Sequence, residues 1–209
     1  MTQAAPARKP RTAPPETRRR QLIDATITAI SKHGLSGTTL TLVTREAGLS
    51  LGLVNFHFRN KDGLFAQTLK FLAQEHRELW MHDLTRRDLA PAAKLNAIVD
   101  AQFHPRICNR KKLSVWFAFF GEAAHRKAYR ATSSEIDMER QTVCTELCRD
   151  IMREGACPGV APEDIAATLE GMFDGLWLNI LMYPDRFTRL DAHRQVLGYL
   201  ALVFPKHFG

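Results

Sequence analysis

Aromatic residues lie close to carboxylates in two segments of the chain, and this combination could bind an organic cation. In the segment VWFAFFGE, Trp116 and Phe120 are four residues apart and share one face of a helix, and Glu122 follows them. In the segment DGLWLN, Asp174 and Trp177 are three apart. Indole rings beside a carboxylate suit a quaternary ammonium ion, which offers no hydrogen bond but is attracted to aromatic faces. The alternative is that these aromatic residues only fill a hydrophobic core.

The sequence offers no arrangement that suits catalysis or a metal ion. The 8 histidines are scattered without the spacing of metal ligands, and the 4 cysteines lack paired CxxC motifs, so we expect reduced thiols. Glu135, Asp137 and Glu139 alternate along an expected helix start, where a solvated surface is the ordinary explanation. We therefore predict no catalytic residue, no metal and no cofactor, and a protein that is not an enzyme.

The net charge is confined to the first part of the chain. Residues 1–87 contain 14 Lys+Arg and 7 Asp+Glu, whereas residues 88–209 contain 15 of each kind. A basic head on a neutral body is typical of a protein that binds a polyanion such as DNA. A solvated basic tail without a partner is the alternative.

Helical periodicity runs through the chain without strand-like alternation of useful length, so we expect an all-α fold. Residues 1–15, rich in proline, alanine and cations, are expected to form a disordered basic arm. A first helix is predicted from Pro15 to about Lys32, ended by Gly34. Thr39 or Thr41 is expected to cap a short second helix.

A glycine, a leucine and a serine interrupt the helical pattern at residues 48–50. Gly48 can take the left-handed conformation that ends a helix, Leu49 can tuck into the core, and Ser50 can cap the next helix through its hydroxyl. Two short helices joined by so tight a turn cross steeply, as in a helix-turn-helix. We therefore expect the third helix, from residue 51 to about 57, at the outer surface, with Val54 and Phe58 toward the core.

A long fourth helix is predicted from Lys61 to about Leu84, capped by Asn60, and its free N–H groups could receive a phosphate. The rest of the chain predicts a body of about five helices. They are expected to begin at Pro91, near Leu113, at Ser133 or Ser134 and at Pro162, with a last one around Val196–Phe204.

Residues 39–65, TLTLVTREAGLSLGLVNFHFRNKDGLF, resemble the DNA-binding signature of the TetR family, and the preceding segment RRRQLIDAT resembles its first helix. The features that carry the resemblance are Thr39, Val43, Ala47–Ser50, Gly52, Phe58 and Lys61. Two positions depart from the family pattern. Thr44 stands where a small alanine is usual, and Asn55 stands where a phosphate-binding tyrosine is common. Asparagine can bond adenine at two atoms, so Asn55 could read a base.

The resemblance implies a TetR-like architecture. A helix-turn-helix head of residues 16–62 is expected to be joined by the fourth helix to a ligand-binding and dimerisation body of residues 63–209. The expected DNA contacts are Arg18, Arg19, Arg20, Thr41, Leu51, Gly52, Leu53, Asn55, Phe56, His57 and Lys61. Three alternatives remain: a solvated helix start for the arginines, a simple cap for Thr41, and a space-filling role for His57.

RRRQLIDAT, the tryptophan–phenylalanine cluster and DGLWL also resemble the BetI branch of the family, choline-sensing repressors of glycine-betaine synthesis genes. This resemblance implies choline or a related quaternary ammonium compound as the effector. It also implies that Trp116, Phe120, Glu122, Asp174 and Trp177 bind that effector. The last two helices are expected to form a homodimer, whose two heads, spaced ~34 Å apart or a multiple of it, would bind double-stranded palindromic operator DNA.

Other functions remain open at this stage. The chain could be a TetR-type regulator for a different small apolar or aromatic effector, or a ligand-independent DNA-binding dimer. It could also be a ligand-binding module or enzyme whose basic head is incidental. No apolar run reaches the ~18 to 20 residues of a membrane span, and the N-terminus lacks a secretory signal, so we expect a bacterial cytoplasmic protein without a membrane partner.

Overall fold

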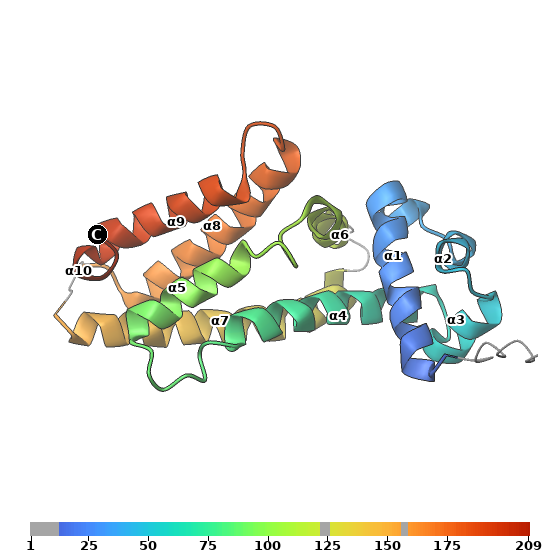
Figure 1. Cartoon of the computed structure of the whole chain (residues 1–209), viewed down its shortest axis with the longest axis horizontal. Coiled ribbons are helices and arrows are strands. Elements are labelled where there is room, and N and C mark those ends of the chain that lie inside the picture. Colours follow the sequence, from blue (N-terminus) through green and yellow to red (C-terminus); the bar gives the residue numbers. More distant parts are fainter. Residues whose placement is uncertain (1–12, 122–125, 156–158) are drawn as a thin grey trace, which may run out of the picture.

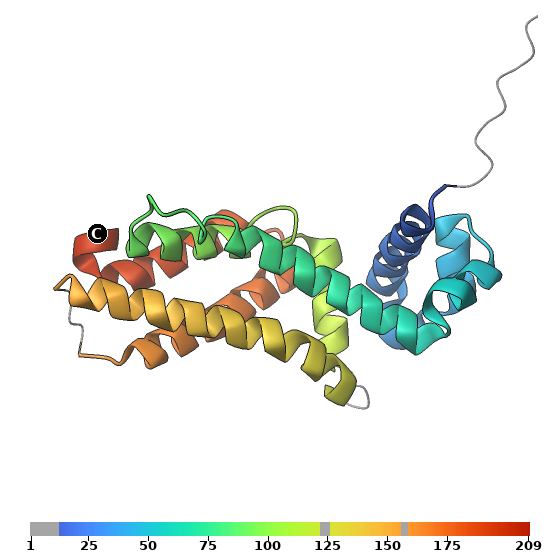
Figure 2. The same ribbon diagram turned by 90° about the horizontal axis from the view of Figure 1, so that it is seen from below.

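The computed structural model describes residues 13–121, 126–155 and 159–209, with the side chains of residues 126–136 left aside. These ranges are helical and contain no strand. A small head lies at one end of an elongated helical body, and α4 runs from the head into the body (Figure 1, Figure 2). The helices are α1 (Pro15–Gly37), α2 (Leu40–Ala47), α3 (Leu51–Phe58), α4 (Lys61–Met81), α5 (Pro91–Gln102), α6 (Arg110–Gly121), α7 (Arg126–Arg153), α8 (Pro162–Met182), α9 (Arg189–Val203) and α10 (Pro205–Phe208).

The head forms because α2 and α3 pack against α1. Each has 8 residues, too few for a helix that is stable by itself in water. Val43 of α2 and Val54 of α3 are completely buried, and Phe58 is nearly so. Burial of these side chains against the apolar face of α1 therefore holds both short helices in place.

The turn between α2 and α3 is made by backbone hydrogen bonds around Gly48. Gly48 takes φ 64° and ψ 34°, the left-handed conformation. Its N–H donates to the Arg45 carbonyl (3.3 Å), and the Leu49 N–H donates to the Thr44 carbonyl (3.0 Å), which is the Schellman pattern. Leu49 is half-buried against the core, as predicted.

The predicted caps are partly confirmed. Thr39, rather than Thr41, caps α2 by accepting from the Leu42 N–H (3.2 Å), and Asn60 caps α4 by accepting from the Gly63 N–H (2.8 Å). The prediction that the Ser50 hydroxyl caps α3 is wrong, because its side chain makes no capping hydrogen bond. Ser50 is exposed, so water can satisfy the first N–H groups of α3.

Several predicted helix ends differ from the observed ones. The turn at Gly34 is present, with φ 70°, but a last helical turn continues to Gly37. Helix α4 ends at Met81 and not at Leu84, and α6 begins earlier than predicted. Helix α7 begins at Arg126, several residues before the predicted serines, because no glycine or proline interrupts residues 126–134. The one-turn helix α10 was missed, since four residues are too few to show a period.

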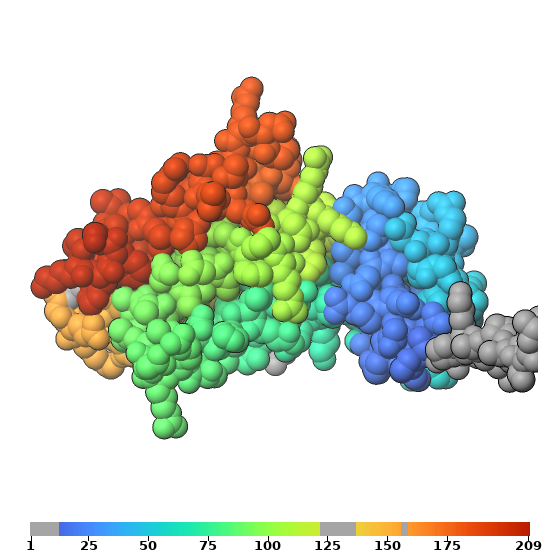
Figure 3. All heavy atoms as spheres, viewed as in Figure 1, coloured from blue at the N-terminus to red at the C-terminus, as the bar shows by residue number. Residues whose placement is uncertain are grey.

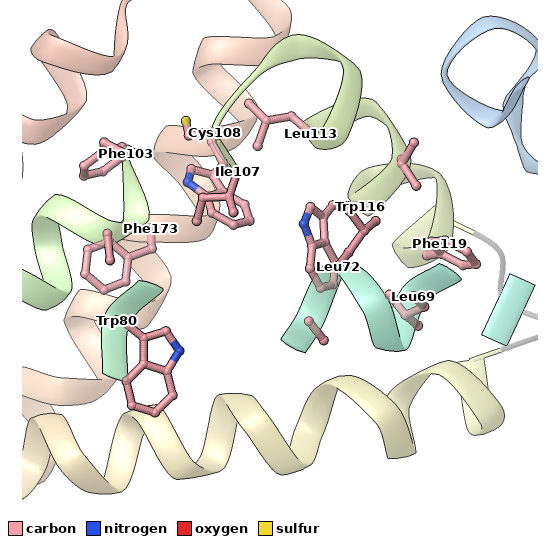
Figure 4. Packing of buried hydrophobic residues seen from close by; sticks show 14 of the residues in the cluster. Leu69, Leu72, Trp80, Phe103, Ile107, Cys108, Leu113, Trp116, Phe119 and Phe173 are labelled. Atoms are coloured by element: carbon pink, nitrogen blue, oxygen red, sulfur yellow. The ribbon is translucent and has the colours of Figure 1, made fainter. Parts of the chain in front are cut away.

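The body encloses its core between α4 to α9. Helices α4 and α7 pack along each other, and α8 and α9 form an adjacent pair on the opposite side (Figure 1, Figure 2). Large side chains from α4, α6 and α8, among them Trp80, Trp116 and Phe173, are directed into the space between these helices (Figure 4). Within the described ranges, no helix is long and apolar enough to span a membrane.

Helix α6 gives the head a second attachment to the body besides α4. It packs extensively against α1, and Figure 3 shows the two segments in contact at the junction of head and body. There the Ser114 hydroxyl donates to the Ser31 hydroxyl (3.0 Å). The start of α6 is held to α4 by the buried carboxylate of Glu75, which binds Lys112 and, at 3.0 Å, Arg106. The head is therefore braced by two helices that both reach into the body.

The junction of α3 and α4 depends on Gly63, because a Cβ atom there would lie 2.3 Å from the Phe58 carbonyl oxygen. We expect Gly63→Ala to lower the free energy of unfolding by about 2 kcal/mol, since backbone atoms must move to relieve the clash. Gly52→Ala is the matched control, because its Cβ would meet only the Ser50 Oγ at 3.8 Å. Urea unfolding followed by circular dichroism measures both variants. Equal stability of the two would contradict this account of the junction.

Candidate functional site

The outer face of α3 consists of side chains that the core does not use. Leu51, Gly52, Asn55 and Phe56 are exposed, and the Phe56 ring, at 76% exposure, is a large apolar group in solvent. These residues lie opposite the buried Val54 and Phe58. The segment after the turn therefore lies at the surface, as predicted, and an exposed aromatic ring there indicates a surface that meets a partner.

Two other predicted residues of α3 are half-buried. Leu53 packs against the core of the head. The His57 and Phe56 rings form a T-shaped pair with 5.0 Å between centroids, and the His57 ring lies 6.0 Å from the Phe58 ring. His57 therefore supports neighbouring aromatic rings while part of it remains exposed.

Thr41 and Lys61 lie at the amino-terminal ends of α2 and α4. Because Thr39 supplies the cap, Thr41 is left as an exposed residue in the first turn of α2. Lys61 is the first residue of α4, and its Nζ lies 5.2 Å from the centroid of the Phe65 ring. Helix amino-termini attract anions through their free N–H groups, so both positions suit a phosphate.

The predicted arginines at the start of α1 already have partners within the protein. Arg18 donates to the Gln21 side chain of the same helix (3.0 Å). Arg19 donates to the Gln67 side chain on α4, and its guanidinium lies 5.6 Å from the centroid of the Phe58 ring. Arg19 therefore links α1 to both α3 and α4.

Arg20 has a similar structural role. It pairs with Asp24 at 2.9 Å, and its guanidinium lies 3.9 Å above the Phe71 ring of α4. Contacts of the three arginines with DNA remain a prediction, and the basic residues of the arm before residue 13 lie outside the described ranges.

A cavity of about 330 Å³ lies in the body, lined by residues of α4, α5, α6, α7 and α8. Trp116 and Phe120 of α6 and Asp174 and Trp177 of α8 line it, so the structure brings these four predicted ligand-binding residues together. Glu122, the fifth, lies outside the described residues. The volume is at the lower end of the range for small-molecule sites, about 300 to 1,000 Å³.

One wall of the cavity is aromatic. The Trp116 ring lies 6.4 Å from the Trp177 ring and 6.1 Å from the Phe120 ring, measured between centroids. The Trp177 Nε1–H donates to the backbone carbonyl of Gln102 at 2.9 Å, which fixes the orientation of the indole. The aromatic cluster that the sequence suggested is therefore a preorganised wall formed by two helices.

Several cavity residues were missed by the sequence analysis. They are His76 of α4, Gln102 of α5, Asp137, Met138, Arg140 and Gln141 of α7, and Glu170 and Phe173 of α8. Asp137 is exposed, as expected of a solvated face, and it also lines the cavity, where it accepts from the Arg140 Nη2 at 3.2 Å. No local pattern marks these polar residues, because their place in the cavity depends on how α7 packs against α8.

The charged side chains of the cavity are three carboxylates and one guanidinium. Arg140 is buried and donates through Nε to Glu170 Oε1 (2.9 Å) and through Nη2 to the other oxygen of Glu170. Burial, together with repulsion from Asp137 and Glu170, raises the pKa of Asp174. Burial likewise raises the pKa of Asp137, although Arg140 opposes that shift. The cavity therefore has an excess of negative charge that a cation would balance.

The three described cysteines do not line this cavity. Cys108, Cys144 and Cys148 are buried free thiols, and burial raises the pKa of Cys108 and of Cys148 to about 12. Such thiols are unreactive at neutral pH. Cys157 lies outside the described residues, and the described part of the chain contains no group of three or more His, Cys, Asp or Glu residues that could hold a metal ion.

Known proteins resemble this chain over nearly its whole length. Residues 22–68 match the family described as bacterial regulatory proteins, tetR family, and residues 91–205 match the BetI-type transcriptional repressor C-terminal family. A protein of Paraburkholderia phymatum named HTH-type transcriptional regulator BetI is 36% identical over 196 residues, which covers 91% of this chain and 95% of the relative. The protein of the same name from Paraburkholderia xenovorans is 34% identical, covering 90% of this chain and 94% of that one.

Solved structures share the fold. A transcriptional regulator from Pseudomonas aeruginosa PAO1 has a TM-score of 0.80 at 24% identity, over 94% of each chain. A transcriptional regulator from Saccharomonospora viridis, solved in complex with choline, has a TM-score of 0.74 at 16% identity, over 88% of this chain and 96% of that one. With its helix-turn-helix head and its BetI-type C-terminal domain, the chain belongs to the TetR family of transcriptional regulators and is not an enzyme.

Proposed function

We propose that the protein is a transcriptional repressor whose affinity for operator DNA is controlled by choline or a closely related quaternary ammonium compound. The observation that carries the proposal is the cavity in which Trp116, Phe120 and Trp177 lie beside an excess of carboxylates. The regulators named BetI and the choline complex of the Saccharomonospora viridis protein agree with it. The genes under control would be those for glycine-betaine synthesis.

The chemistry of the cavity favours a permanently charged organic cation. A quaternary ammonium ion has no N–H to donate, so it gains most from aromatic faces and from nearby negative charge. The indoles of Trp116 and Trp177 provide the aromatic faces. Asp174 and Asp137 provide negative charge that the single guanidinium in the cavity lining does not fully balance. A neutral apolar effector would leave this negative charge unbalanced.

The outer surface of α8 and α9 supports a homodimer. Leu190 and Leu202 of α9 are 80% and 84% exposed, and Leu178 and Met182 of α8 are also exposed. Large apolar side chains exposed on two neighbouring helices are typical of a surface that another chain covers. The exposed Gly171 and Gly175 of α8 would allow close helix approach, although they could instead relieve crowding within one subunit. A dimer would present two heads to a palindromic operator.

The helix contacts support a route from the cavity to the head. Helix α6 contributes Trp116 and Phe120 to the cavity and Ser114 to the contact with α1, and α4 contributes His76 to the cavity and begins in the head. An effector that binds one arrangement of these helices more tightly would shift the population of head positions. A coupling of ~1 to 3 kcal/mol changes operator affinity about 5- to 150-fold.

Operator binding tests the proposal directly. Fluorescence anisotropy with the promoter DNA upstream of the protein's own gene should show tight, salt-dependent binding that choline weakens by at least about fivefold. Lys61→Gln should weaken binding and reduce the slope of log affinity against log salt by about 1, since one phosphate contact is lost. Asn55→Ala should weaken binding chiefly to the operator and less to unrelated DNA.

Lys206→Gln is the matched control for charge, because Lys206 is an exposed residue of α10 in the body. It should bind the operator as the unaltered protein does. Operator binding that choline leaves unchanged would contradict the choline effector, and absence of salt-dependent binding would contradict the DNA-binding role.

The affinity for a quaternary ammonium ion should decrease as the pH falls. Asp137 and Asp174 have pKa values raised above 3.8, and a bound cation favours their ionised form. The affinity for the ligand therefore has its full value when the pH is above the raised pKa values of these two carboxyl groups. It decreases as the pH falls through those values, although the ligand keeps its positive charge. Calorimetric titration with choline between about pH 7 and about pH 4.5 measures the effect within the range where proteins keep most carboxylates ionised.

The other charged groups at the cavity are Glu170 and Arg140, which pair with each other. We expect Asp174→Asn to weaken choline binding about fivefold at neutral pH, the effect of a partly solvated ion pair, and to flatten the pH dependence. Asp185→Asn, at an exposed residue outside the cavity, should keep the original profile. A choline affinity that Asp174→Asn leaves unchanged at neutral pH would rule out the proposed role of this carboxylate.

A further inference from the structure

We infer that Phe56 selects thymine in the operator by packing its ring against the C5-methyl group of that base in the major groove. Among the four DNA bases, only thymine presents a methyl group there. Each half-site of the operator would then contain a thymine opposite the middle of α3. The inference rests on the DNA-binding part of the proposed function, because it assigns the base feature that the outer face of α3 recognises.

Phe56 lies at the centre of the outer face of α3. Val54 and Phe58 are 0% and 5% exposed and define the inner face of the helix. With 3.6 residues per turn, position 56 lies directly opposite the midpoint between positions 54 and 58. The Phe56 ring is accordingly 76% exposed. Phe56 is therefore the side chain of α3 that is best placed to enter the major groove.

Exposed large apolar side chains in the described part of the head are confined to α3. They are Leu51, at 48% exposure, and Phe56. A single exposed apolar side chain is common on soluble proteins. Two of them on the helix that follows the helix-turn-helix turn indicate an apolar surface that a partner covers.

The Phe56 ring has a neighbour that supports it and open space beside it. It forms a T-shaped pair with the half-buried His57 ring, with 5.0 Å between centroids. Gly52, one turn earlier on the same face, has no side chain, and a Cβ atom there would meet only the Ser50 Oγ at 3.8 Å. The edge of a base can therefore approach the first turn of α3 next to the ring.

The composition of α3 disfavours recognition of guanine. The helix contains no Lys and no Arg, the side chains that most often bind the O6 and N7 atoms of guanine. Arg59 and Lys61 follow the helix, where they suit phosphates. The exposed amide of Asn55 can bind adenine. One amide beside exposed apolar side chains therefore matches A·T base pairs, and the thymine methyl group is the feature that a phenyl ring can contact.

Replacement of thymine by uracil in the promoter DNA tests the inference with the full-length protein. Uracil pairs with adenine through the same atoms and lacks only the C5-methyl group. Fluorescence anisotropy compares the promoter fragment upstream of the protein's own gene, prepared with either base throughout. We expect the uracil fragment to bind roughly 15-fold more weakly, since burial of one methyl group changes an equilibrium constant about fourfold and a dimer has two heads.

Two substitutions at one position locate the effect, at a salt concentration low enough for every variant to bind. Phe56→Ala should bind both fragments about equally, because the apolar contact is lost. Phe56→Leu keeps an apolar side chain and should retain a preference for thymine of about fourfold. Both variants should have the native circular dichroism spectrum, since Phe56 is exposed.

Lys61→Gln is the matched control in the binding surface. It removes a cation next to α3 and should weaken binding to both fragments by the same factor, so that the preference for thymine is unchanged. An effect of the missing methyl groups on the shape of the DNA would act on Phe56→Ala as strongly as on the unaltered protein.

The outcomes separate this inference from the proposed function. If the unaltered protein binds the thymine and uracil fragments equally well, selection of thymine is overturned while DNA binding stands, and this comparison needs no variant. A preference for thymine that Phe56→Ala retains in full also overturns the inference, because another residue would then contact the methyl groups. If the unaltered protein does not bind the promoter fragment, the proposed DNA-binding role fails, and the inference fails with it.

Discussion

The central physical constraint in this molecule is that α6 is packed on two sides at once. Its aromatic residues Trp116 and Phe120 line the cavity, and its Ser114 lies against Ser31 of α1. Because protein interiors are close-packed, a movement of the residues on one side of a helix also displaces the residues packed on its other side. An effector that moves Trp116 therefore acts on a helix that also supports the head. The buried Glu75 ties the start of α6 to α4, so the two helices that reach the head are joined to each other.

The head itself follows from a second constraint, the shortness of α2 and α3. Neither helix is stable alone, and both depend on burying Val43, Val54 and Phe58. The left-handed turn at Gly48 sets the angle between them, and the close approach at Gly63 sets the angle between α3 and α4. With one face of α3 fixed in the core, its other face has to point outward. Recognition of DNA half-sites at a fixed spacing requires a rigid outer face of α3 and a head that is held firmly to the body.

The sequence predicted the features that depend on local chemistry. The glycine turn, the cap at Asn60 and the inward residues of α3 follow from conformational preference and helical period, and the structure has all of them. The prediction that Ser50 caps α3 was wrong because, at an exposed turn, water competes with the Ser50 hydroxyl for the first N–H groups of the helix.

Features that depend on tertiary packing escaped prediction. The local sequence does not indicate whether Arg140 is buried or solvated, because its burial results from the packing of α7 on α8. The same holds for His76 and Gln102, which meet only in the folded body. The aromatic residues of the cavity were found because tryptophan at helical spacing is informative and because the resemblance to a known family pointed to them. Their polar neighbours have no comparable signal.

Coupling between cavity and head is the central claim, and thermodynamic linkage tests it most directly. The choline affinity of the free protein can be compared with that of the protein saturated with operator DNA, by calorimetric titration under identical conditions. Because coupling is reciprocal, bound operator should weaken choline binding by the same factor by which choline weakens operator binding, at least about fivefold. Equal choline affinity with and without operator would show that the cavity and the head do not share one equilibrium, and would contradict the account.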